Sequence, residues 1–174
     1  MTMCLLCGEA SFGRHAIAMM ERPAHRLAGL WWEGTYAEAA GGATRAALAA
    51  VKNISDSRDA LWKSPIVGLS WSQGENGLRY FCGIAIEADE AVSPGFSTVD
   101  LPSAEFAGSW HGPDDGDVVS HLGRILEWLR LQGLSWDRTH CQQREEYAPD
   151  VDFDGPPALR LMLPVARVSR QRYG

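Results

Sequence analysis

Two halves of this sequence match one another when the chain is shifted by 79 residues. Ala28-Gly29-Leu30-Trp31 then falls on Ala107-Gly108-Ser109-Trp110, and the match continues without a gap. Arg79 to Ile86 falls on Ala158 to Val165, and both segments are short and apolar, as core strands are. An internal repeat reports architecture directly, because each copy forms the same structural unit. The sequence therefore predicts a fold made of two like halves.

Each half also contains one amphipathic helix at equivalent positions. The apolar residues are spaced i, i+3, i+4, i+7, which places them on one helix face. These residues are Ala43, Ala46, Ala47 and Ala50 in the first half and Leu122, Ile125, Leu126 and Leu129 in the second. The pattern predicts helices near 37–52 and 117–132, the second capped by Asp115 or Asp117 and stopped by Gly133.

The remaining apolar segments predict strands, so that each half has the order strand, helix, strand, strand. Each half is also expected to have a leading strand. The expected strands are near 14–21, 24–33, 65–72, 79–88, 95–101, 104–111, 140–147 and 158–166.

The expected fold class is α+β, a duplicated β-α-β-β module with pseudo-twofold symmetry and an antiparallel sheet. Two helices are expected on one face of the sheet and a ligand groove on the other. Residues 14–167 are expected to form one domain with pseudo-repeats of about 14–90 and 95–167, flanked by tails at 1–13 and 168–174.

Period-two alternation predicts which strand residues line the groove, because neighbouring residues point to opposite faces. In the last strand the odd-numbered residues from Leu159 to Val165 are apolar and are expected under the helices, which directs Met162 into the groove. By the repeat, Phe81 faces the groove and Tyr80 belongs to the core.

Glu145 is the candidate central residue of the groove. Glu146 is adjacent, but only one of the two side chains can enter the groove, so they do not form an acid–base pair. Glu145 shares a face with Tyr147 and, by the repeat, with Ile66 and Gly68. A carboxylate beside aromatic rings attracts a lipophilic cation. The attraction is on the order of 4 kcal/mol for a close charge pair at intermediate dielectric, and ring faces add to it. The same carboxylate could activate a water. The alternative is an exposed charge on an edge strand.

Charge and cysteine usage limit partners and compartment. The 16 Lys and Arg against 22 Asp and Glu give a formal charge of -6, which disfavours a phosphate backbone or an anionic membrane as partner. A neutral or cationic ligand is expected. Four irregularly spaced cysteines, with no signal peptide and no long apolar run, predict a cytoplasmic protein that does not span a membrane.

No motif points to a metal or a cofactor. Cys4 and Cys7 are half of a zinc site that no second pair completes, and the five histidines show no metal spacing. Ser70 to Gly74 is not a nucleophile elbow, and no phosphate-binding glycine loop occurs. Nucleotide hydrolysis is therefore excluded, and no cofactor is expected.

Several motifs, in order and spacing, resemble the GyrI-like, or AraC-type effector-binding, domain family over about residues 14–166. The motifs that carry the resemblance are Leu27-Ala28-Gly29, Gly34-Thr35-Tyr36, Gly68 within Pro65 to Leu69, Leu78-Arg79-Tyr80, Gly83-Ile84, Pro102 to Ala107, Trp128-Leu129, Glu145-Glu146-Tyr147 and Leu163-Pro164-Val165.

The resemblance implies a small-molecule-binding protein. Family members occur alone or fused to DNA-binding helices, and the roughly 14 residues before the first strand are too few for a helix-turn-helix domain. We therefore expect this domain to occur without a DNA-binding domain. The resemblance also implies a hydrophobic ligand, a lipophilic cation in members with multidrug specificity, that is held by Glu145 and oriented by Tyr147. Arg144 stands where the family commonly has an aromatic residue, which leaves the ligand's identity open. Relatives that hydrolyse cyclopropane-bearing DNA-alkylating compounds or inhibit DNA gyrase imply two alternatives, with Glu145 and Tyr147 catalytic in the first. The candidate ligand-binding residues are Glu145, Tyr147, Trp31, Trp110, Tyr36, Trp71, Phe81 and Met162.

Overall fold

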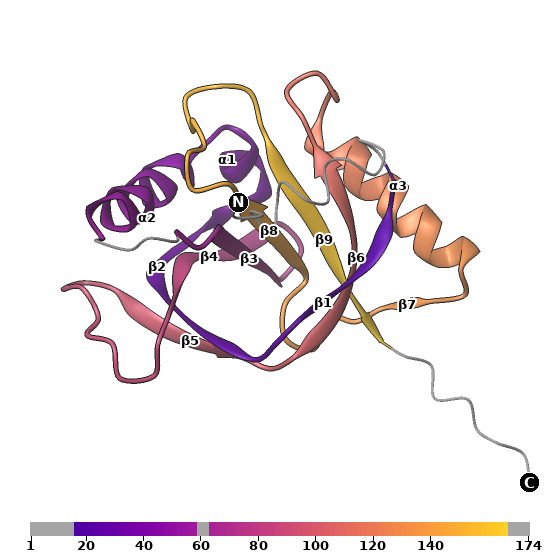
Figure 1. Cartoon of the computed structure of the whole chain (residues 1–174). Helices are drawn as coiled ribbons and strands as arrows, with labels where there is room; N and C mark the ends of the chain where they lie inside the picture. Colours follow the sequence, from indigo (N-terminus) through magenta and orange to yellow (C-terminus); the bar gives the residue numbers. More distant parts are fainter. Residues whose placement is uncertain (1–15, 59–62, 167–174) are drawn as a thin grey trace, which may run out of the picture.

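The computed structural model describes residues 16–58 and 63–166, and these form one curved antiparallel sheet with helices packed on it (Figure 1). Cys4, Cys7 and the expected tails at 1–13 and 168–174 lie outside the described residues. The elements are β1 (Ala18–Arg22), β2 (His25–Thr35), α1 (Tyr36–Ala40), α2 (Arg45–Ser57), β3 (Ile66–Gln73), β4 (Gly77–Ile86), β5 (Ser97–Leu101), β6 (Ala104–His111), α3 (Val118–Leu131), β7 (Ser135–Trp136), β8 (Gln143–Tyr147) and β9 (Leu159–Ala166). The predicted α+β class is confirmed.

The sheet joins the two halves at its centre and at its ends. The strand order is β1-β6-β9-β8-β3-β4-β2-β5, so β3 and β8 pair across the middle. Two residues separate β1 from β2 and two separate β5 from β6. Because β1 pairs with β6 and β5 pairs with β2, each half extends a leading strand onto the other half. The sheet that results is strongly curved (Figure 1).

The strand registers repeat at the 79-residue spacing found in the sequence. Gly29 pairs with Gly83, and Gly108 pairs with Met162. Each residue of the second pair stands 79 positions after its equivalent in the first pair. A Cβ on Gly29 would lie 1.9 Å from the Cys82 carbonyl oxygen, and one on Gly108 would lie 2.5 Å from the Leu161 carbonyl oxygen. The repeated Ala-Gly therefore marks two equivalent close approaches of neighbouring strands.

The central pair of strands departs from this spacing by two residues. Gly68 pairs with Cys82 on β4, and Glu145 pairs with Leu161 on β9. Cys82 and Leu161 are 79 residues apart, whereas Gly68 and Glu145 are 77 apart. These last two residues also pair with each other, so the pseudo-twofold axis passes between Gly68 and Glu145.

Helices cover one face of the sheet, which we call the helix side. Buried Leu48 and Val51 of α2 pack with Ile66, Tyr80 and other residues of β3 and β4. Buried Ile125 and Leu129 of α3 pack with apolar residues of β6 and β9. The odd-numbered apolar residues of β9, Leu159, Leu161, Leu163 and Val165, belong to this second core, as predicted.

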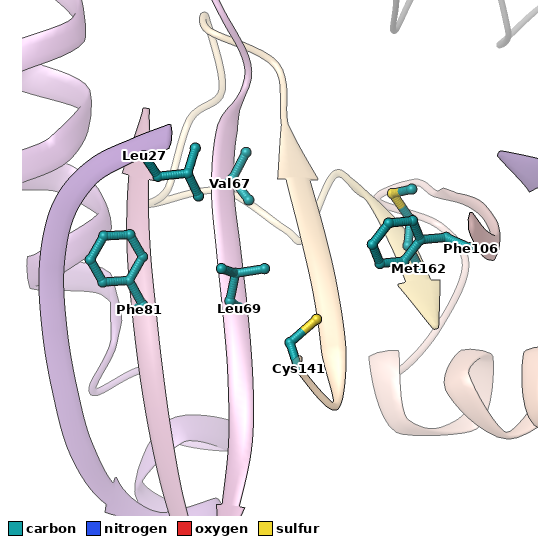
Figure 2. Close-up of a cluster of buried hydrophobic side chains, with 7 residues drawn as sticks. All are labelled: Leu27, Val67, Leu69, Phe81, Phe106, Cys141 and Met162. Carbon is teal, nitrogen blue, oxygen red and sulfur yellow. The ribbon is translucent and has the colours of Figure 1, made fainter. Parts of the chain in front are cut away.

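The opposite face, which we call the open side, has its own core without helix residues. Figure 2 shows its seven buried side chains, in which Phe106 and Met162 of one half lie apart from the β3 and β4 residues of the other half. They are Leu27, Val67, Leu69, Phe81, Phe106, Cys141 and Met162. Alternation therefore placed Phe81 and Met162 on the correct face.

The first predicted helix is interrupted. The expected helix at 37–52 is divided into α1 and α2, and α1 begins with a capping box in which Thr35 and Glu38 satisfy each other's backbone N–H. Gly42 has φ of +92°, a left-handed conformation that ends the first helix. The predicted cap of the other helix is confirmed for Asp117, which accepts from Ser120 N at 2.8 Å. None of the helices among the described residues has the length and apolar content to cross a bilayer.

Candidate functional site

A carboxylate held by two phenols and an amide lies on the helix side. Tyr80 Oη and Tyr147 Oη each donate a hydrogen bond to Glu145 Oε2 at 2.8 Å. Gln143 Nε2 donates to Glu145 Oε1 at 2.9 Å. Gln143, Glu145 and Tyr147 are alternate residues of β8, so they share a side of the sheet. We call these four residues the tyrosine–carboxylate cluster.

Gly68 makes room for this cluster. A Cβ at this position would lie 2.2 Å from Tyr80 Oη and 2.8 Å from Glu145 Oε2. Since real Cβ atoms do not approach other atoms so closely, any larger residue would displace the phenol from the carboxylate. The glycine in a central strand therefore serves the close approach of two side chains.

The cluster lies where the two helix-side cores meet. Tyr147 packs against the core under α3 and against the core under α2. Phe153, from the connection between β8 and β9, packs edge-on against Tyr147 with ring centroids 5.1 Å apart. Glu145 keeps partial exposure, whereas Tyr80 is buried. A ligand that reaches the junction between the halves would meet one carboxylate bordered by aromatic rings.

Burial dominates the electrostatics of the cluster. Burial raises the pKa of Glu145 above its ordinary value, although hydrogen bonds from Tyr147, Tyr80 and Gln143 favour the ionised form. Burial and the neighbouring Glu145 charge raise the pKa of both tyrosines well above 10. The phenols therefore remain protonated donors at neutral pH. The Glu145 carboxylate is only weakly hydrated, so its charge is stabilised mainly by these hydrogen bonds.

The adjacent Glu146 points to the open side and has the opposite environment. Arg22 Nε donates to Glu146 Oε1 at 2.7 Å, and Arg144 Nε donates to the same oxygen at 2.8 Å. Burial alone would raise the pKa of Glu146, but the two arginines outweigh it and lower the pKa to about 2. Glu146 is therefore ionised and holds the Arg22 and Arg144 side chains in place.

The structure divides the predicted site residues between the two sides. Trp31 packs on the open side with Trp71 at 5.4 Å and with Phe81 at 5.0 Å between ring centroids, and the Arg79 guanidinium lies 3.9 Å from the Trp31 centroid. Met162 belongs to the same side.

Two further predicted residues lie away from the tyrosine–carboxylate cluster. Trp110 and Phe106 are both even-numbered residues of β6, so their side chains lie on the same side of the sheet, the open side. Tyr36 opens α1 at the surface, where its hydroxyl lies 2.5 Å from Ser72 Oγ.

The expectation that Glu145 shares the groove with Phe81 and Met162 is therefore wrong. Alternation fixes only which residues of one strand share a side, and β8 presents Glu145 and Tyr147 to the helix side. Ile66 of the neighbouring strand β3 is a buried helix-side residue and pairs with Tyr147. Paired residues share a side of the sheet, so Tyr147 and Glu145 lie on the helix side. The burial of Ile66 is thus the signal that assigns Glu145 to its side.

The sequence did not assign Tyr80, Gln143 or Phe153 to this site, whereas the repeat did place Gly68 on the face of Glu145. Tyr80 was expected only in the core, and Gln143 and Phe153 were not considered. A glycine inside a strongly apolar strand is the signal that could have found the site, because it marks a close approach. Among residues 16–58 and 63–166, no group of three or more His, Cys, Asp or Glu gathers as metal ligands do.

A family model for the GyrI-like small molecule binding domain matches residues 15–166. The chain belongs to the GyrI-like family. As a member, it is a small-molecule-binding domain, and the match spans both halves of the sheet. No curated protein sequence matches the chain.

Several solved structures share this GyrI-like fold at low sequence identity. The protein SAV2435 bound to tetraphenylphosphonium has a TM-score of 0.66 and 13% identity, covering 90% of this chain and 98% of its own. The EcmrR C-terminal domain has a TM-score of 0.59 and 12% identity, covering 88% and 98%. A hydrolase from Listeria innocua has a TM-score of 0.53 and 12% identity, covering 91% and 96%.

Proposed function

We propose that this GyrI-like domain binds a hydrophobic organic cation at the tyrosine–carboxylate cluster. The observation that carries the proposal is the Glu145 carboxylate, which three side-chain donors fix in place while it stays partly exposed at the junction of the halves. The rings of Tyr147 and Phe153 border it and supply apolar and cation–π contact.

The charge of Glu145 gives the cation its advantage over a neutral ligand. A desolvated carboxylate and a cation in contact attract by on the order of 4 kcal/mol at an intermediate effective dielectric. Burial raises the pKa of Glu145, so the ionised form is costly in the free protein and a bound cation offsets that cost. The neighbour SAV2435, which was solved with tetraphenylphosphonium, supports this ligand class.

Calorimetric titration with tetraphenylphosphonium tests the proposal. We expect binding to the wild type and at least a tenfold loss of affinity in Glu145→Gln, about 1.4 kcal/mol or more. Glu75→Gln is the matched control, because it removes the same charge from an exposed turn remote from the cluster. Equal affinity in the wild type and Glu145→Gln would remove Glu145 from the site.

Hydrolysis is the second candidate, because Glu145 Oε2 contacts two phenolic protons and a structural neighbour is described as a hydrolase. In this alternative Glu145 accepts a proton from water, the water oxygen bonds to a strained cyclopropane carbon as the ring bond breaks, and Tyr147 donates a proton to the opened product. Incubation with cyclopropane-bearing alkylating compounds and mass spectrometry of the products tests it. Absence of a water adduct above the protein-free rate would retire the enzyme hypothesis.

We also propose a cytoplasmic location and no direct nucleic-acid partner. Cys82 and Cys141 are buried free thiols, which suit a reducing compartment. The formal charge of -6 disfavours contact with a phosphate backbone.

A further inference from the structure

The two halves differ in the connection between their last two strands. In the first half three residues, 74–76, join β3 to β4, whereas in the second half eleven residues, 148–158, join β8 to β9 (Figure 1). The first half closes the equivalent strand pair with a tight turn, so the fold does not require the longer connection. We call residues 148–158 the β8–β9 loop.

The β8–β9 loop lies across the junction of the two halves. Val151 and Phe153 alternate with exposed aspartates and pack against the core under α2, which contains Tyr80. Because β8 and β9 belong to the other half, the loop passes over the boundary where Glu145 lies. The Phe153 ring also packs edge-on against Tyr147, which donates a hydrogen bond to Glu145. The loop therefore adjoins the tyrosine–carboxylate cluster.

Apolar contacts hold the loop to the helix side. Within the part of the chain that the structure describes, its hydrogen bonds stay inside the loop, and none of its aspartates forms an ion pair. The bonds run from Val151 N to Ala148 O at 3.0 Å, from Asp154 N to Asp152 Oδ1 at 3.0 Å and from Gly155 N to Asp152 O at 3.3 Å. The loop can therefore leave the helix side without breaking a hydrogen bond, as segments of low local stability do.

A bulky cation at Glu145 needs the space in which Phe153 meets Tyr147. The two ring centroids are 5.1 Å apart, and a third ring between them would need about 3.5–4 Å on each side. Entry of such a ligand thus requires that Phe153 move. Movement exposes the apolar surface of Val151 and Phe153 to water, which is unfavourable unless the ligand covers it again.

We propose that the β8–β9 loop is a gate on the cation site and that Phe153 determines which cations enter. The gate opens when Val151 and Phe153 leave the core under α2, and it closes with the Phe153 ring against the ligand. A cation with a large apolar body compensates for the opening, whereas a small hydrated cation supplies charge without apolar area. This inference rests on the proposed function, because the gated site is the tyrosine–carboxylate cluster.

Titration with a large and a small cation, followed by NMR, tests the selectivity of the gate. We expect the wild type to prefer tetraphenylphosphonium over tetramethylammonium by about a hundredfold or more. Phe153→Ala should reduce this preference by about tenfold or more, because the small cation gains access and the large one loses a ring contact. An unchanged preference in Phe153→Ala would overturn the gate.

Phe96→Ala is the matched control. Phe96 comes from the connection between β4 and β5 and packs against the same core under α2, but the ring against Tyr147 is that of Phe153. The control substitution therefore removes an equal ring from the same core and should keep the wild-type preference.

Relaxation dispersion of the unmutated, ligand-free protein tests the opening itself. We expect the amides of Val151, Phe153 and Gly155 to exchange on the microsecond-to-millisecond timescale of loop opening, and those of β3 and β4 to show no exchange. Loop amides without exchange would contradict the gate.

The pKa of Glu145, measured from its carboxyl carbon shift, links the loop to the site. Burial raises this pKa, so Phe153→Ala, which admits water, should bring it toward 4.5, while Phe96→Ala should not change it. The wild-type pKa in Phe153→Ala would count against the gate. Failure of tetraphenylphosphonium to bind would overturn the proposed function, whereas binding without loop exchange would overturn the gate alone.

Discussion

Two adjacent glutamates show how one residue step changes chemistry in a strand. Glu145 faces phenols on the helix side, and Glu146 faces guanidinium groups on the open side. Burial raises the pKa of Glu145, while the arginines lower that of Glu146 to about 2 against an ordinary value of 4.5. Sequence alone showed that the two side chains diverge, because alternation is local. It placed Tyr147 beside Glu145, but it did not show that Tyr80 of β4 and Arg22 of β1 would join the two carboxylates, because contacts between strands are not local.

The two glutamates are predicted to have opposite effects on stability. The pKa of Glu145 is raised in the folded state, so its ionisation above pH 4.5 lowers the free energy of unfolding. Glu145→Gln should leave this free energy at pH 7 unchanged within about 0.5 kcal/mol or increase it. Glu146→Gln should lower it by about 3–5 kcal/mol, because the buried arginines lose their counter-charge.

Urea unfolding at pH 7 and along an acid series checks both effects. Stability due to Glu146 is present above pH 4.5 and lost as the pH falls toward about 2, so the wild type and Glu146→Gln should converge in that window. Equal destabilisation by the two substitutions at pH 7 would contradict the assigned environments.

Ligand affinity should also depend on the ionisation of Glu145. A cation favours the ionised carboxylate, so affinity for tetraphenylphosphonium should fall as the pH falls through the raised pKa of Glu145. Titrations between pH 5 and pH 8 measure this, with Glu145→Gln as the control that should give a flat profile. A flat profile in the wild type would show that another group supplies the attraction.

At the scale of the element, β3 is shaped by the site it adjoins. Gly68→Ala should push Tyr80 from Glu145, since the new Cβ would lie 2.2 Å from the phenolic oxygen. We expect a loss of about 1–3 kcal/mol in the free energy of unfolding, as for overpacked cores, together with weaker tetraphenylphosphonium binding.

Gly123→Ala on α3 is the matched control for this substitution. A Cβ at Gly123 meets nothing within 4 Å, so the same change there should stabilise the helix by about 0.5–1 kcal/mol. Thermal unfolding and calorimetry of both variants provide the comparison. A Gly68→Ala protein with wild-type stability and affinity would show that this close approach is not required.

Most elements could be predicted from periodicity, and the errors have local causes. The strand expected at 104–111 is β6, and the helix expected at 117–132 is α3, one residue shorter at each end. The first helix was expected to run from about residue 37, although the alanines that carry the helical spacing, Ala43 to Ala50, all lie after Gly42. Hydrophobic periodicity cannot reveal a single left-handed residue. Gly42 changes the direction of the chain without changing the spacing of the apolar residues. The short β7 has too few residues to carry a pattern.

At the scale of the whole molecule, the repeat predicted the architecture but not the site. A 79-residue spacing holds for the outer strand pairs, and it predicted two similar halves around a shared sheet. The spacing of the central strands is two residues shorter, and the candidate ligand-binding residue Glu145 lies there, on the axis between the halves. Side chains at such an axis come from strands far apart in sequence, so their contacts depend on register across the halves. A repeat within one chain does not specify that register.

The two sides of the sheet differ in the charged groups that they present. The helix side offers a carboxylate among aromatic rings, and the open side offers guanidinium groups among apolar walls.

A structure of the complex with tetraphenylphosphonium tests the central claim most directly. We expect the phosphonium on the helix side, in contact with Glu145 and with the rings of Tyr147 and Phe153. A phosphonium bound on the open side, against Trp31 and Phe81, would contradict the account.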